Sequence, residues 1–209
     1  MNFAPFGLRP VGYANASDWN GQITRYSIDS AYATALYTGD PIQVAGSASA
    51  ITGYATIAQA AATGQWTGVL KGVAYVDPTG LTRYVKSWTP GTLIQANSEI
   101  IADVIDDPSV IYEIQVAADG PVAGNIVADN IQLNANFGQV AQWAPNIQVG
   151  LSGAFLRTDT IAPTNTFPLK IIGLAFQLGA NAGNAFGVNY NIVRVVPNNT
   201  IYRVGTTGV

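Results

Sequence analysis

The feature that most constrains the fold is the two-residue period of the apolar side chains. Between Ser109 and Val116 every second residue is apolar, and Ser, Glu and Gln occupy most of the alternate positions. This period places one face of a β-strand in a core, whereas a helix needs apolar residues about every 3.6 positions. The same pattern, or a short apolar run, predicts further strands at Gln22–Ile28, Ile42–Ala45, Gly68–Val76, Leu81–Trp88, Ile100–Ile105, Ile147–Leu151, Ala154–Arg157, Lys170–Leu178 and Thr200–Val204.

Two further patterns qualify this β interpretation. From Val188 the alternation continues to Ile192 and then changes phase at Val193. A phase slip of this kind indicates a bulge or a strand that passes from one sheet to another. Helix signals are weak, because neither the Ala-rich segment Ala55–Ala62 nor Pro121–Ile131 carries a full amphipathic stripe. We therefore expect little helix.

Turn signals separate the predicted strands at short intervals. Pro presets φ, Gly permits positive φ, and Asn or Asp bonds its own backbone. These signals occur at Thr38–Pro41, Asp77–Gly80, Thr89–Gly91, Asp106–Pro108, Asn181–Asn184 and Pro197–Asn199. Many short strands with such turns predict an all-β fold, either a β-sandwich or a barrel, with a jelly-roll-like arrangement left open. We expect one β domain over residues 11–209, with any sub-division near residue 120.

The first ten residues form a segment of different composition. They contain Pro5 and Pro10, and Pro cannot donate to the ladder of a central strand. We therefore expect residues 1–10 to form an extended N-terminal arm that lies along a neighbouring subunit. In this hypothesis the apolar anchors are Phe3, Phe6 and Leu8, and the polar latch is Arg9. The alternative is a disordered terminus.

Charge is scarce in this chain, and its absence excludes several kinds of chemistry. Only 10% of the 209 residues are charged, against about 25% in a typical domain. Without His or Cys, the chain has no disulfide, no thiolate or imidazole metal ligand, and no Ser-His-Asp or Cys-His catalytic set. The net charge is −3 and the nine Lys and Arg residues are spread singly. The sequence therefore predicts neither nucleic acid nor an anionic membrane as a partner.

The densest acidic cluster is the one group of residues that suggests catalysis or metal binding. It contains Asp103, Asp106 and Asp107, with Glu113 downstream. Paired carboxylates can hydrolyse glycosides or bind Ca²⁺. The favoured interpretation is a hairpin turn at Asp106–Pro108, since Asp side chains cap such turns routinely. We therefore expect no enzymatic activity, no cofactor and no metal site.

Two other features allow a binding function. The Gly-rich segment Gly179–Gly187 lacks the Gly-Lys-Ser/Thr ending of a phosphate loop, so a wide hairpin loop is favoured. Tryptophans in a low-charge β-protein can stack on sugar rings, but large aromatic residues more often fill cores or interfaces. We therefore favour core or interface positions for all four tryptophans, which are Trp19, Trp66, Trp88 and Trp143.

Several motifs, taken in order along the chain, resemble one family. They are the "GLRP" start at Gly7–Pro10, "GDP" at Gly39–Pro41, "DDP…YEIQ" at Asp106–Gln115, "LKIIGL" at Leu169–Leu174 and a closing Asn-rich strand. Together they are similar to small virion proteins of tailed bacteriophages, which are labelled capsid decoration, cement or head structural proteins. The similarity covers most of the chain.

The resemblance implies an all-β protein on the exterior of an icosahedral capsid, made in the host cytoplasm. Its partner would be the major capsid protein, bound at junctions between capsomers. The chain would form a homo-oligomer, with a trimer favoured over a dimer. The resemblance implies no catalytic residues. Low charge with many aromatic residues fits a protein with many interfaces. A carbohydrate-binding or lectin-like module is the alternative, and a minor coat or surface-layer protein of a cell is a third interpretation.

Overall fold

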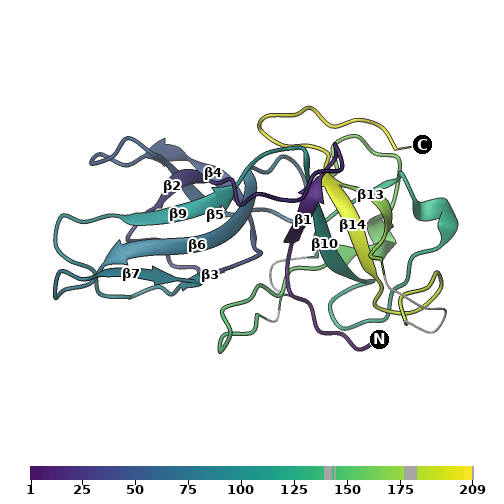
Figure 1. Ribbon diagram of the computed structural model, residues 1–209, viewed down its shortest axis with the longest axis horizontal. Coiled ribbons are helices and arrows are strands. Elements are labelled where there is room, and N and C mark those ends of the chain that lie inside the picture. Colours follow the sequence, from purple (N-terminus) through teal and green to yellow (C-terminus); the bar gives the residue numbers. More distant parts are fainter. Residues whose placement is uncertain (139–142, 144, 177–182, 209) are drawn as a thin grey trace.

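The expected all-β class is confirmed by a computed structural model, which describes residues 1–138, 143, 145–176 and 183–208 (Figure 1). The strands are β1 (Arg9–Tyr13), β2 (Thr24–Ile28), β3 (Leu36–Tyr37), β4 (Pro41–Ala48), β5 (Ala55–Gln59), β6 (Gly68–Val76), β7 (Thr82–Val85), β8 (Ser87–Trp88), β9 (Ile100–Ile105), β10 (Val110–Ala117), β11 (Asn134–Ala135), β12 (Leu156–Arg157), β13 (Leu169–Leu174) and β14 (Ile192–Pro197). Two 3₁₀ turns, η1 (Ala128–Asn130) and η3 (Thr158–Thr160), are the helical elements of the described residues. No helix in this part of the chain is long and apolar enough to cross a membrane.

A closed five-stranded barrel makes up the first lobe. Its strand order is β4-β5-β2-β9-β6, and β6 returns to pair with β4. All neighbours are antiparallel except β2 and β5. The inward positions of β9, at Ile100, Ala102 and Val104, are almost fully buried, as the two-residue period requires. β7 pairs with the far half of β6, outside the closed barrel.

An open sheet makes up the second lobe. Its order is β1-β10-β14-β13-β11, and β12 adds a short parallel pairing to β10. The apolar positions of β10 and β14 form the core of this lobe. The barrel contributes Trp66, Val69 and Ile105 to the same cluster. The Trp66 indole N–H donates to the carbonyl oxygen of Pro168 over 3.1 Å. The two lobes, which lie side by side in Figure 1, are therefore packed against one another.

The turn at Asp106–Pro108 joins the two lobes and is not a hairpin. β9 belongs to the barrel and β10 to the second sheet. The turn chemistry itself is as expected, because a carboxylate oxygen of Asp107 accepts the backbone N–H of Ser109 over 2.8 Å. The hairpin expectation was wrong because two strands that are consecutive in the sequence and joined by a turn need not pair. Each of them can enter a different sheet, as β9 and β10 do. The change of sheet thus lies at residues 106–109, not near residue 120.

Some predicted strands are shorter than expected or absent. Residues 147–151 and 200–204 form turns and isolated bridges. Alternation before Ile192 does not produce a strand, because Asn191 turns its side chain inward and accepts the Ile126 N–H over 2.9 Å. The phase change at Val193 follows the start of β14. The ladder between β13 and β14 has a register shift between Ile171 and Gly173, opposite Val195 and Arg194. Residues 179–182 of the Gly-rich segment lie outside the described residues.

Candidate interface at the N-terminal segment

The first residues of the chain are held along the second sheet by one side chain of β10. The Gln115 amide oxygen accepts the backbone N–H of Ala4 over 2.8 Å, and its amide nitrogen donates to the carbonyl oxygen of Asn2 over 2.9 Å. Between these two residues, the Phe3 ring packs edge-on against Phe155, with ring centroids 5.6 Å apart. Gln115 thus fixes the backbone on both sides of Phe3.

Gly7 is the point where this segment approaches the barrel most closely. It has φ +74°, and a Cβ there would lie 2.5 Å from the Cβ of Ser152 and 2.6 Å from the carbonyl oxygen of Gly39. The next residue, Leu8, donates its N–H to the same Gly39 oxygen over 2.9 Å. Only glycine fits this position, because any side chain would collide with two neighbouring segments. Residues 7 and 8 therefore tie the N-terminal segment to the turn before β4.

Two of the four predicted interface residues do not have the surroundings expected of a free arm. Leu8 is 2% exposed and belongs to the core of the second lobe. It is therefore not available as an anchor on another subunit. Arg9 and Pro10 are the first residues of β1, paired with β10. A Pro is tolerated here because β1 is an edge strand, where a missing N–H costs no ladder hydrogen bond.

Arg9 does act as a latch, but within its own chain. Its guanidinium pairs with the carboxylate of Glu113 at 2.5 Å and lies 5.1 Å from the ring centroid of Phe6. The Glu113 carboxylate also pairs with the guanidinium of Arg194 on β14, at 3.5 Å. The Arg9 side chain remains 60% exposed. Arg9, Phe3 and Phe6 thus keep surface for a partner, although each has contacts in this chain.

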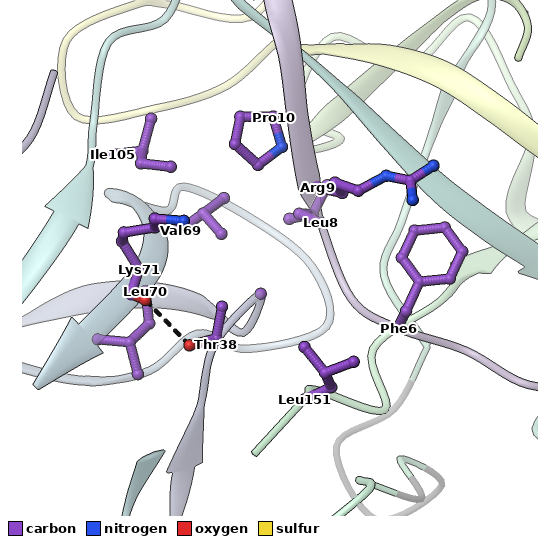
Figure 2. A pocket seen from close by; sticks show the side chains of 11 residues that line it. Phe6, Leu8, Arg9, Pro10, Thr38, Val69, Leu70, Lys71, Ile105 and Leu151 are labelled. Carbon is purple, nitrogen blue, oxygen red and sulfur yellow. Dashed lines mark hydrogen bonds between the residues drawn. The ribbon is translucent and has the colours of Figure 1, made fainter. Parts of the chain in front are cut away.

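A pocket lies between the N-terminal segment and the barrel (Figure 2). Its volume is about 170 Å³. The lining is largely apolar, and its residues come from five separate parts of the chain. They are Phe6, Leu8, Arg9 and Pro10; Thr38 and Gly39; Val69, Leu70 and Lys71; Ile105; and Leu151. The pocket therefore exists only where the first strand, the barrel and the segment around residue 151 meet.

Two cationic side chains, Arg9 and Lys71, line this pocket. Lys71 lies on β6 opposite Arg9 in Figure 2, with its ammonium 5.2 Å from the ring centroid of Trp19. The backbone of Lys86 is close by, because the Thr38 hydroxyl lies 2.9 Å from the Lys71 carbonyl oxygen and 2.8 Å from that of Lys86. Both lysines are exposed. Among the described residues, neither has a carboxylate within 4.0 Å.

The acidic cluster singled out in the sequence is divided among structural contacts. Asp103 faces Arg25 at 3.8 Å. Asp106 accepts hydrogen bonds from the hydroxyls of Thr24 and Tyr26. In the described part of the chain, no three acidic residues come close enough together to hold a metal ion. The structure therefore does not bring these carboxylates together as a site.

The interpretation of the tryptophans as core residues is confirmed for two of them. Trp66 and Trp88 are each 1% exposed. Trp19 and Trp143 are partly buried against the core of the second lobe. Trp66 and Trp88 therefore offer no open ring face of the kind that stacks on a sugar.

The sequence did not point to Lys71, Thr38, Leu151 or Gln115. A lone lysine in a strand, or an amide in the middle of one, carries no local signal of its neighbours. Comparisons with protein-family models, curated proteins and solved structures find no match to this chain.

Proposed function

We propose that this chain is a structural virion protein, which binds the outer surface of a phage capsid at capsomer junctions and stabilises the shell. The ordered motif resemblance supports this function. The structural observation that supports it most is a surface with few charges and large apolar side chains on both lobes. Exposed apolar residues of this size mark interaction surfaces when they gather into patches.

One such patch lies at the end of the barrel. Leu81 and Tyr84 project from the β6–β7 hairpin, and Tyr84 is 80% exposed. Leu93 lies in a neighbouring loop, which is attached to the hairpin by the Gln95 N–H bond to the Val76 carbonyl oxygen (2.9 Å). Interface cores are depleted of charge and enriched in Tyr, Trp and Phe. The patch has the composition of a contact surface, and the β6–β7 hairpin lies at the end of the barrel away from β1 and β10 (Figure 1).

The mechanism of such a protein is mass action. A protein that binds assembled shell but not free subunits stabilises the assembled state by its binding free energy. Several contacts within a homo-oligomer add avidity without a new kind of contact. We propose a trimer, since a threefold junction presents three equivalent sites.

Carbohydrate binding is the weaker candidate. Its expected carriers were the tryptophans, and these lie partly or fully in the cores. No other observation in the described residues favours a sugar ligand.

Co-sedimentation with empty shells of the cognate major capsid protein tests the proposal. The chain should pellet with shells in a saturable way and raise the temperature at which the shells come apart. Sedimentation equilibrium should give the mass of an oligomer. A stable monomer that stays in the supernatant while the shells pellet, and that does not raise the temperature at which they come apart, would refute the function.

A further inference from the structure

We propose that the pocket between the N-terminal segment and the barrel takes an apolar side chain of the major capsid protein, from a segment in which that side chain is flanked by Asp or Glu. This inference rests on the proposed function and names the chemistry of the partner at one site. The size of the pocket, the rigid lining and the charges around it support this inference.

The size of the pocket suits one side chain. A dry apolar cavity of about 150 Å³ binds benzene, and this pocket measures about 170 Å³. A Leu, Ile or Phe side chain is therefore of suitable size. A polar occupant would find few partners, because the Thr38 hydroxyl already bonds backbone carbonyl oxygens.

The lining of the pocket is held in place before any partner binds. Leu8, Val69, Leu70 and Ile105 are at most 2% exposed and lie on β1, β6 and β9 or directly beside them. The approach of Gly7 to Gly39 fixes the N-terminal side of the pocket. A preformed site costs less ordering on binding, so more of the contact energy appears as affinity.

The surrounding charge favours an acidic partner. The chain as a whole carries −3, yet two cations from separate segments, Arg9 and Lys71, line this pocket. Of these two cations, Arg9 is paired with Glu113, which Arg194 also contacts, whereas no carboxylate of the described residues lies within 4.0 Å of the Lys71 ammonium. Carboxylates on both sides of the apolar side chain would complement these cations.

A pair of charge reversals tests the inference. Lys71→Glu changes a cation at the pocket, and Lys170→Glu makes the same change on β13, three strands away from β1 in the second sheet. We expect Lys71→Glu to weaken binding to empty shells roughly tenfold or more, and to flatten its dependence on salt. Lys170→Glu should bind as the wild type does. Circular dichroism should be unchanged for both, since Lys71 is exposed and the partly buried Lys170 bonds only Thr206 and the Thr207 carbonyl oxygen near the end of the described chain.

The outcomes separate this inference from the proposed function. If the wild type binds shells and Lys71→Glu binds equally well at all salt concentrations, the inference is wrong and the proposed function stands. If the wild type does not bind shells, the proposed function is wrong and the inference falls with it. Equal losses in both variants would show a general charge effect and would also overturn the inference.

Cross-linking identifies the occupant directly. Leu151 lines the pocket and is only partly buried, so a photoreactive benzoylphenylalanine fits there without emptying a core. Mass spectrometry of the product should show a peptide of the major capsid protein that contains an apolar residue beside Asp or Glu. A peptide without a carboxylate, or a second copy of this chain, would contradict the inference.

Discussion

Arg9 and Glu113 are direct partners across β1 and β10, and Glu113 and Arg194 are direct partners across β10 and β14. The three side chains thus form a row over three strands, with one carboxylate between two cations. Glu113 is 7% exposed, and both arginines contact its carboxylate. Through this row the N-terminal segment is attached to the middle of the second sheet.

The first prediction concerns this row. Glu113→Gln should destabilise the fold by roughly 1–2 kcal/mol, because it leaves two guanidinium groups facing each other without a carboxylate. The destabilisation should be this small because both arginines are partly exposed to solvent, which screens their charges. Urea unfolding measures it. Asp159→Asn, which breaks the local Arg157 pair, is the control and should cost roughly 0.5 kcal/mol or less. Equal losses would argue against the three-strand row.

The second prediction concerns Gly7. Gly7→Ala should cost roughly 2–4 kcal/mol, since the new Cβ meets Ser152 and Gly39 and the backbone has positive φ. Gly21→Ala is a matched control, because Gly21 has φ +86° but no atom within 4 Å of its Cβ position. It should cost about 1 kcal/mol from backbone strain alone. The difference between the two midpoints in urea measures the close approach. A difference near zero would mean that the segment is not seated there.

The third prediction concerns pH and the buried Asp40. Burial raises the pKa of Asp40 to about 6, although the Ser152 hydroxyl, the backbone N–H of Tyr37 and the Gln59 side chain oppose this shift through hydrogen bonds. None of these groups is charged. Because the folded pKa exceeds the unfolded value of 3.8, the folded state binds the proton more tightly. The contribution of Asp40 to stability is therefore full below about pH 4 and is lost as the pH rises through 6.

Asp40→Asn isolates this contribution. The variant should remove up to about 3 kcal/mol of pH-dependent stability between pH 4 and 7, which corresponds to a shift of about two pKa units. Thermal unfolding across this range measures the effect as the difference between wild type and variant. A constant difference at every pH would show that Asp40 titrates normally.

The fourth prediction has the opposite sign. In the β6–β7 turn, hydrogen bonds from Thr79 hold the pKa of Asp77 well below its usual range, with the Leu81 N–H and Arg83 adding to the effect. Its stabilisation is present above the unfolded pKa near 4 and is lost only as the pH falls through the lower folded value. Asp77→Asn should therefore lower the unfolding temperature at pH 7 and have a smaller effect near pH 3. A loss that does not shrink in acid would contradict this assignment.

The parts of the fold that were predictable are those with a local signal. β6 and β9 begin and end where their alternation does, since one face of each lies in a core. The Ala-rich segment at residues 55–62 gave a weak helix signal, yet Ala55–Gln59 is the strand β5. Pairing with β4 and β2 decided its structure, because sheet pairing overrides the helix propensity of a short Ala-rich segment.

The candidate site was predictable only in part. Phe6 and Arg9 were singled out by composition and do lie at the pocket. Leu8 was misjudged because nothing in a ten-residue window shows which of three apolar side chains enters a core. Lys71 could not be found at all, since its place beside Arg9 depends on how the barrel packs against β1.

The topology also bears on how the chain is made. β1 pairs with β10, and the whole barrel, from β2 to β9, lies between them in the sequence. A ribosome therefore delivers a complete barrel before the partner of the first strand exists, and non-local pairings of this kind form late. Until β10 emerges, Leu8 and its neighbours remain exposed on the nascent chain. The pocket is thus assembled last, so partner recognition through it would begin only when synthesis of the second lobe is well advanced.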